Sequence, residues 1–300
     1  MDTAQRCFLR WQVGEVRITR VAELGGAPFP STFVFPAATP ELVQRHAWLR
    51  PHFAHEDGRL YGSIHSFVIE SGKRRIIVDT CVGNDKPRSI RAWNLLQGPF
   101  LADLALAGFP ADSIDTVLCT HLHVDHVGWN TRRVNDRWVP TFPNARYLFG
   151  RREWEHWSSA GAQHRDGDVM GDSVRPIIAA GLAELVEMDH ALTAEVRLEP
   201  TPGHTPGHVS VRISSRGEEA VITGDLMHHP LQCAEPDLAN NFDVDAATAR
   251  RTRREFLSRH ANKPVLVLGT HFAPPSGGWV VDAEQAWRFD VAPAASGGGR

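Results

Sequence analysis

The sequence predicts an α/β fold arranged as a four-layer αββα sandwich, in which two mixed β-sheets pack together and helices lie outside them. Short β-rich runs recur in both halves of the 300-residue chain, and helical segments are interspersed among them. Three of these runs end directly before a residue of a metal-binding type, namely His121, Asp225 and His271. Because strand ends are rigid places from which side chains can be aimed, we expect these three residues to share one cleft.

The first half of the chain contains five β-rich runs. Residues 11–22 alternate apolar and polar side chains, as a half-buried strand does. Gly72, which separates two further runs, predicts a hairpin. The predicted strands are 11–22, 64–70, 74–79, 115–120 and 145–150, and the predicted helices are 40–47, 99–108 and the segment REWEHW.

The second half predicts five more strands and one long helix. Residues 158–181 form a looser stretch that ends in a short helix, and Asp245 is placed to cap the long helix. The predicted strands are 184–188, 195–200, 208–214, 219–223 and 264–270, and the long helix is 245–260.

We expect a single domain over residues 1–290, followed by a disordered low-complexity tail at 291–300. Residues 25–62 are rich in proline, aromatic residues and histidine, and they predict an irregular N-terminal insertion. This insertion either covers the site or forms a contact in a homodimer.

Composition excludes several classes of function. The formal net charge is −3 and no basic run is present, so we expect neither nucleic acid nor a membrane as a partner. The four cysteines are far apart and form no CxxC pair, which argues against a disulfide framework or a cysteine-based zinc site. The N-terminus lacks the apolar stretch of a signal peptide, so a cytoplasmic location is the expectation.

The densest cluster of chemically active residues is the run from His121 to His126. His121 and His123 are one residue apart, so on extended backbone they can point the same way and share one ion. A turn at Asp125 and His126 would aim these two side chains at a neighbouring site. Imidazole and carboxylate suit divalent first-row metals, and packing does not easily explain four such residues within six positions.

Two closed metal sites require ligands from other segments. The loop TPGHTPGH offers His204 as a ligand, while His208 is better placed to support the loop or begin the next strand. Asp225 stands at a strand end, where its two carboxylate oxygens could bridge two ions, although a helix-capping role would also explain an aspartate there. The segment VLGTHFAPP supplies His271.

The string THLHVDHVGWN and these later residues together resemble the signature of the metallo-β-lactamase superfamily. The likeness runs from about residue 12 to about residue 282, and Asp79 in IIVDTCVGN is similar to a family residue that contacts the ligands. The family order HxHxDH, His, Asp, His is matched by His121, His123, Asp125, His126, His204, Asp225 and His271.

The resemblance implies the metallo-β-lactamase fold and a centre of two divalent metal ions. One ion would take His121, His123 and His204, and the other would take Asp125, His126 and His271. Asp225 and a hydroxide would bridge the ions, the hydroxide would attack the scissile bond, and Asp125 is the candidate proton shuttle. Zn²⁺ is the first expectation, and Mn²⁺, Co²⁺ and Fe²⁺ also fit such ligands.

Within the superfamily, the chain resembles the acyl-homoserine-lactone lactonases and the methyl parathion hydrolase group. The long N-terminal segment is more similar to the second group. Lactonases typically place a tyrosine three residues after the bridging aspartate, and this sequence has His228 there. His228 either donates a hydrogen bond to the substrate in a catalytic role or only supports the site.

The predicted function is hydrolysis of lactone or ester bonds in a small, largely apolar substrate. The candidate pocket residues are Trp129, directly after the metal motif, together with Phe33 and Trp157. The first alternative is an organophosphate triester hydrolase. The second is a mononuclear-iron oxidoreductase of the same fold, which the complete second ligand set argues against.

Overall fold

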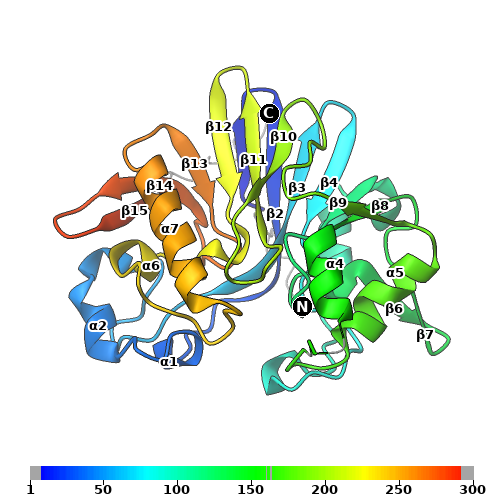
Figure 1. Cartoon of the computed structure of the whole chain (residues 1–300), viewed down its shortest axis with the longest axis horizontal. Coiled ribbons are helices and arrows are strands. Elements are labelled where there is room, and N and C mark those ends of the chain that lie inside the picture. Colours follow the sequence, from blue (N-terminus) through cyan, green and yellow to red (C-terminus); the bar gives the residue numbers. More distant parts are fainter. Residues whose placement is uncertain (1–7, 160, 163, 292–300) are drawn as a thin grey trace.

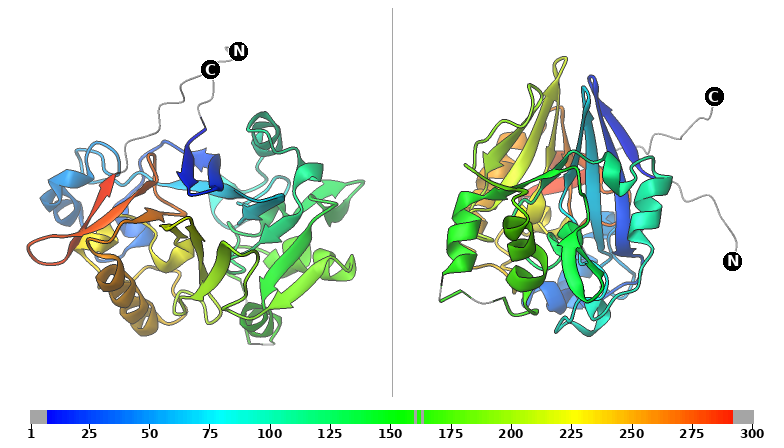
Figure 2. Two further views of the ribbon diagram at one scale, coloured as in Figure 1. Left: turned by 90° about the horizontal axis from the view of Figure 1, so that it is seen from above. Right: turned by 90° about the vertical axis from the view of Figure 1, so that its right-hand side faces the viewer.

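The computed structural model describes residues 8–159, 161–162 and 164–291, and these residues form the predicted αββα sandwich (Figures 1 and 2). The first sheet has the strand order β1-β2-β3-β4-β5-β8-β9, and the second runs from β10 to β15 in sequence order. Strands β4, β5, β8 and β9 pair in parallel, as do β12 and β13, so both sheets are mixed. The first sheet contains β1 (Arg10–Val13), β2 (Val16–Gly25), β3 (Ser63–Ser71), β4 (Arg74–Val78), β5 (Thr116–Leu118), β8 (Arg146–Gly150) and β9 (Ala183–Val186). The second contains β10 (Val196–Pro200), β11 (Val209–Ser215), β12 (Glu218–Ile222), β13 (Val265–Leu268), β14 (Gly277–Asp282) and β15 (Trp287–Val291).

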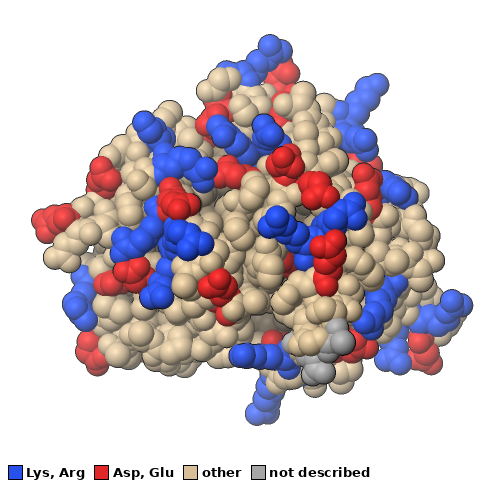
Figure 3. Space-filling view, in the orientation of Figure 1, with Lys and Arg blue, Asp and Glu red and all other residues tan. Residues whose placement is uncertain are grey.

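Helices cover the outer face of each sheet (Figure 2). Those on the first sheet are α3 (Phe100–Leu106), α4 (Arg151–Ser158) and α5 (Arg175–Ala179). Those on the second are α1 (Ser31–Val34), α2 (Pro40–Arg45), α6 (Leu231–Ala234) and α7 (Ala246–His260). Within the described residues, no helix has the length and apolar character needed to cross a membrane. Figure 3 shows acidic and basic side chains interspersed over one face of the molecule.

The alternation of side chains along the strands produces three apolar layers. In β4, Ile76 and Val78 pack between the two sheets, while Ile77 faces the helices outside the first sheet. In β12, Ile222 packs between the sheets and Val221 faces the helices on the other side. Because side chains alternate along a strand, each central strand fills the middle layer and one outer layer. This packing holds the strand ends rigidly.

Several predicted elements differ from the observed ones. Residues 11–22 are two strands joined by a tight turn at Gly14, whose φ is +55°, rather than one strand. The prediction also omitted β14, β15, α1, α6 and the hairpin of β6 (Thr131–Val134) and β7 (Arg137–Pro140). Gly277 and Gly278 begin β14, and glycine is depleted in strands, while the hairpin is short and rich in charge. The predicted cap of α7 is confirmed, since the Asp245 side chain accepts hydrogen bonds from Ala247 N and Thr248 N.

The insertion at 25–62 packs against the second sheet and reaches the edge of a cavity. Phe35 and Phe53 are buried in the outer layer of that sheet, and Phe29 and Phe33 line the cavity. A subunit contact through this segment stays a prediction. At the other end, Val291 is the last residue of β15, and the rest of the expected tail lies outside the described residues.

A buried cluster of charges joins the loop after β4 to the π-helix η5 (Met170–Val174). Arg88 donates hydrogen bonds to both carboxylate oxygens of Asp172, at 2.6 and 3.0 Å. Lys86 is fully buried, and its Nζ donates to Thr131 Oγ1 at 2.8 Å and lies 3.8 Å from the centre of the Trp138 ring. Lys86 Nζ also lies 3.6 Å from Asp172 Oδ1, so Asp172 compensates two buried cations and joins segments that are distant in the sequence.

Replacement of this carboxylate should be strongly destabilising. We expect Asp172→Ala to lower the free energy of unfolding by about 3–5 kcal/mol, because Arg88 and Lys86 would stay buried without a counter-charge. Urea unfolding of the wild type and the variant at equal metal loading measures this change.

Asp136→Asn is the matched control, since Asp136 pairs with Arg133 on the exposed turn of the β6–β7 hairpin and asparagine also suits its φ of +59°. Its expected effect is below about 1 kcal/mol. Lys86→Met in the Asp172→Ala background should recover part of the loss. Equal, small effects of Asp172→Ala and Asp136→Asn would show that Asp172 does not brace the fold.

Candidate metal centre

The loop after β5 carries the first four predicted ligands. His121 is fully buried and His123 is half-buried. The chain then turns at Val124–His126, where His126 N donates to His123 O at 3.1 Å. This is the predicted turn, and it brings Asp125 and His126 together with His271, while the centre of the His126 ring still lies 4.0 Å from that of His121.

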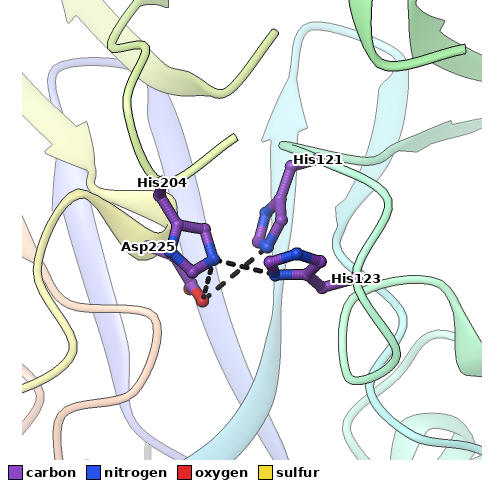
Figure 4. Close-up of side chains that lie close together, drawn as sticks. All are labelled: His121, His123, His204 and Asp225. Atoms are coloured by element: carbon purple, nitrogen blue, oxygen red, sulfur yellow. Dashed lines mark hydrogen bonds and ion pairs between the residues drawn. The ribbon is translucent and has the colours of Figure 1, made fainter. Parts of the chain in front are cut away.

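The remaining three predicted ligands come from the second sheet. His204 lies in the loop between β10 and β11, Asp225 in a short turn after β12, and His271 directly after β13. The parallel register of β12 and β13 brings the last two strand ends side by side. Figure 4 shows His204 and Asp225 meeting His121 and His123 across the space between the two sheets.

The structure brings all seven residues together in two groups with Asp225 between them. Atoms able to bind a metal lie within 4.8 Å of one another in each group, and the groups are His121, His123, His204 and Asp225, then Asp125, His126 and His271. Asp225 Oδ2 lies 3.2 Å from His204 Nε2 and 3.7 Å from His121 Nε2. Asp225 Oδ1 lies 3.2 Å from His126 Nε2 and 3.1 Å from His271 Nε2. Each carboxylate oxygen therefore faces a different group of histidines.

The arrangement of ring nitrogens fits divalent metal ions. His204 Nε2 lies 2.8 Å from His123 Nδ1, and His126 Nε2 lies 3.2 Å from His271 Nε2. Two nitrogens at such distances cannot both carry a proton, so lone pairs converge on each group. Among the described residues, His121 Nε2 is buried without a hydrogen-bond partner. A cation at each group would satisfy these atoms, and the imidazole–carboxylate set is one that zinc and its neighbours prefer.

Outer contacts orient four of the histidines through the ring nitrogen that faces away from the groups. His126 Nδ1 lies 2.9 Å from Asp79 Oδ2, and His204 Nδ1 lies 3.0 Å from Asp243 Oδ1. His271 Nδ1 donates to the backbone oxygen of Ser63 at 3.0 Å. Similarly, His121 Nδ1 lies 3.1 Å from Thr120 Oγ1. Such partners fix the tautomer and the orientation of a metal-binding imidazole.

Glu153 of α4 ties together the two loops that carry the first group. Its carboxylate accepts hydrogen bonds from Leu122 N at 3.2 Å, Gly207 N at 2.8 Å and Trp157 Nε1 at 2.9 Å. Close packing also fixes the backbone where it leaves the metal-binding motif, because a Cβ atom at Gly128 would lie 1.9 Å from Val82 O. Both contacts limit how far the ligand loops can move.

Electrostatics favour neutral rings at His121 and His123 and an ionised carboxylate at Asp225. Burial holds the pKa values of His121 and His123 well below the usual range, so both rings keep a lone pair at neutral pH. Burial alone would lower the pKa of His204, but its hydrogen bonds to Asp225 and Asp243 raise it to about 9. Burial opposes ionisation of Asp225, yet the surrounding histidines keep its pKa well below the usual value.

A cavity of about 980 Å³ opens beside the two groups. Its lining includes the predicted pocket residues Phe33 and Trp157, together with Ile64, Trp93 and Phe242. These side chains give the cavity apolar walls, while Asp125, His228 and His271 form its polar floor.

Trp129, the residue expected to lead the pocket, is not among the cavity-lining residues. Its ring is buried and stacks on Phe100, with ring centres 5.9 Å apart, and its Nε1 donates to Glu23 Oε1 at 2.6 Å. The turn after His126 directs the chain into the core, so that Trp129 packs beneath the site rather than above it.

His228 and His208 lie in different positions relative to the centre. His228 lines the cavity, and its Nε2 lies 3.0 Å from Asp225 Oδ2. His208 is buried outside both groups, where its Nε2 accepts a hydrogen bond from Asp225 N at 2.7 Å. Its Nδ1 donates to Thr201 O at 2.9 Å, so His208 supports the turn that carries Asp225.

Sequence reasoning missed Asp243, Asn240 and Glu153. Asp243 and Asn240 lie in the segment before α7, and Asn240 Nδ2 donates to Asp243 Oδ1 at 2.7 Å. Asp243 and Glu153 contact residues that are distant along the chain, and Asn240 contacts His228 twelve positions earlier, so no regular spacing marks any of the three. The sequence does show a polar run around Asn240, but this run looks like an ordinary surface loop.

Comparisons with known proteins agree with this geometry. Residues 60–289 match the family model described as "Metallo-beta-lactamase superfamily". The N-acyl homoserine lactonase AiiA of Bacillus thuringiensis subsp. kurstaki is 29% identical over 217 residues, covering 68% of this chain and 79% of that protein. The probable metallo-hydrolase YybB of Bacillus subtilis (strain 168) is 24% identical over 187 residues, covering 60% and 72%.

Solved structures show the same fold. The hydrolase AbOPH of the beta lactamase superfamily superposes with a TM-score of 0.78 at 22% identity, covering 95% of this chain and 97% of that one. AidC, a dizinc quorum-quenching lactonase, superposes with a TM-score of 0.78 at 20% identity and the same coverage. With the family match over residues 60–289 and relatives that are lactonases and metallo-hydrolases, the chain belongs to the metallo-beta-lactamase superfamily and is a metal-dependent hydrolase.

Proposed function

We propose that this hydrolase binds two divalent metal ions and cleaves lactone or ester bonds of small, largely apolar substrates. The observation that carries the proposal is the position of Asp225, whose two oxygens face two separate groups of histidines. One ion would be held by His121, His123 and His204, the other by Asp125, His126 and His271, and Asp225 would contact both. We expect Zn²⁺ from the ligand types, with Mn²⁺, Co²⁺ and Fe²⁺ as alternatives.

When bound, the two ions would polarise the scissile carbonyl and supply a nucleophilic water near neutral pH. The protein's own side chains have the remaining tasks. Asp125 is partly exposed to the cavity, with its carboxylate oxygens 3.7 Å from His126 Nε2 and 3.6 Å from His271 Nε2. It is therefore placed to carry a proton between the nucleophile and the leaving group. His228, on the cavity floor, is placed to donate a hydrogen bond to the carbonyl oxygen.

The cavity walls support an apolar substrate. Phe33, Ile64 and Phe242 present apolar surface within reach of the polar floor. Such a site suits the acyl chain of an ester or lactone better than a highly charged molecule. The relatives named as N-acyl homoserine lactonases are consistent with a lactone, and they are similar to this chain over about two thirds of its length. A neutral aryl phosphotriester fits the same walls and is the second candidate.

Acid release from lactones tests the reaction. We expect the zinc-loaded protein to acidify a weakly buffered solution of a medium-chain acyl-homoserine lactone or a simple γ- or δ-lactone, as followed with a pH indicator. Asp125→Ala should lower kcat/KM by about 10²–10⁴-fold, because it removes both a metal ligand and the proton carrier. Asp189→Ala, at an exposed position outside the cavity lining, is the control and should keep wild-type rates.

Two results would contradict parts of this proposal. Absence of acid release with both ions bound would exclude lactones and direct the assay to aryl phosphotriesters and open-chain esters. A single iron per chain, accompanied by oxygen uptake, would show that the centre is that of a mononuclear-iron oxidoreductase and does not catalyse hydrolysis.

Site-selective loss of metal tests the two-ion arrangement. Asp79 contacts His126 directly and Asp243 contacts His204, so each carboxylate directly supports a ligand of a different group, while Asp79 reaches His121 only through Thr120. We expect Asp79→Asn, which keeps a residue suited to the φ of +56° at this position, to weaken mainly the ion near His126, and Asp243→Ala mainly the ion near His204, each by about 10–100-fold. Competition with a chromophoric chelator measures the two affinities in each variant. If one variant weakened both ions equally, or neither variant had an effect, the assignment of separate supports would be wrong.

A further inference from the structure

The amide of Asn240 has one orientation that satisfies its surroundings. Asn240 Oδ1 accepts a hydrogen bond from Phe242 N at 2.7 Å, and a flipped amide would place a donor against that donor. The amino group of Asn240 therefore faces the other way. Its Nδ2 lies 2.7 Å from Asp243 Oδ1 and 3.3 Å from His228 Nδ1. The two amide hydrogens are thus divided between a carboxylate and an imidazole.

This orientation determines where the proton of His228 lies. Because Nδ2 of an amide can only donate, His228 Nδ1 must accept, and the ring proton belongs on Nε2. The other side of the ring agrees, since His228 Nε2 lies 3.0 Å from the Asp225 carboxylate, which can only accept. A proton on Nδ1 would instead oppose the amide hydrogen of Asn240.

Neighbouring groups hold both partners in place. The His228 ring stacks with two neighbouring rings. Its centre lies 6.5 Å from that of Phe242, with 26° between the ring planes, and 5.6 Å from that of His271, with 16° between the planes. Asn240 is buried, and the loop before it is held by Arg253 Nη1, which donates to Leu238 O at 2.9 Å. The contact between Asn240 and His228 is therefore part of a packed structure rather than a mobile surface loop.

We propose that Asn240 is a positioning residue that keeps His228 in the Nε2–H tautomer, so that the proton that faces Asp225 Oδ2 in the described structure can be shared with the carbonyl oxygen of a substrate bound beside it. This inference rests on the proposed function, and it assigns His228 the role of donor rather than base. The opposite tautomer would direct a lone pair at the carbonyl oxygen and repel it. Because negative charge grows on that oxygen in the transition state, a donor fixed in advance acts mainly on kcat.

Nitrogen NMR of the zinc-loaded protein with ¹⁵N-labelled histidine reads the tautomer directly. The His228 signals are identified by their absence in His228→Phe. We expect the wild type to show a protonated Nε2 and an unprotonated Nδ1. Asn240→Leu removes the partner and should give a mixture of the two tautomers.

Kinetics separate this role from general support of the fold. Asn240→Leu should lower kcat on the lactone by about 10–100-fold, less than the loss of an oxyanion donor itself, while KM changes by less than about threefold. In the His228→Phe background the same substitution should change kcat by less than about twofold, because Asn240 acts through His228. Elemental analysis should find two ions per chain in every variant.

Three outcomes would overturn the inference: a wild-type His228 protonated on Nδ1, an undiminished effect of Asn240→Leu in the His228→Phe background, or loss of metal from Asn240→Leu. The last would mean that Asn240 acts through Asp243 and His204 instead. Failure of the proposed function is distinguishable, because a protein that hydrolyses no lactone still gives the nitrogen spectrum that decides the tautomer.

Discussion

The centre depends on one buried carboxylate surrounded by imidazoles. Asp225 is 3% exposed, and a carboxylate so deeply buried requires compensating charge or hydrogen-bond donors. Each of its oxygens faces a different group, with His126 and His271 on one side and His121 and His204 on the other. Because these histidines come from both sheets, the requirements of a single side chain fix how the two halves of the sandwich meet at this edge.

The centre is held rigidly at this edge by an inner and an outer set of contacts around the Asp225 carboxylate. The inner histidines follow strand ends, and an outer set of carboxylates then fixes their rings, with Asp79 on one side and Asp243 on the other. Glu153 adds a third link, between the loop of Leu122 and the loop of Gly207. A centre assembled this way has its ring nitrogens directed inward before any substrate enters, which is the condition for electrostatic stabilisation without rearrangement.

The sequence predicted the parts of this structure that local patterns encode. The recurrence of β-rich runs in both halves, with helices between them, predicted the sandwich, and the spacing of His121, His123, Asp125 and His126 marked the loop that carries them. Partners such as Asp243 and Glu153 were missed, because their roles arise from contacts between distant segments. The prediction for Trp129 was wrong for a related reason. Its nearness to the motif along the chain suggested the pocket, but the turn after the motif places its ring in the core.

The resemblance to lactonases leads us to expect a tyrosine at position 228, and the histidine found there changes the chemistry of the cavity floor. A phenol, as in the lactonase pattern, offers a donor whatever the surroundings, because its hydroxyl hydrogen can rotate toward the substrate. An imidazole offers a donor at Nε2 only if the proton is kept there, so His228 needs a partner that a tyrosine would not. Asn240 is that partner in the described structure, since the Nδ2 amino group of its side chain can only donate a hydrogen bond to Nδ1. A change from tyrosine to histidine at this site is therefore coupled to a second residue twelve positions later, and variants that exchange His228 for tyrosine should lose their dependence on Asn240.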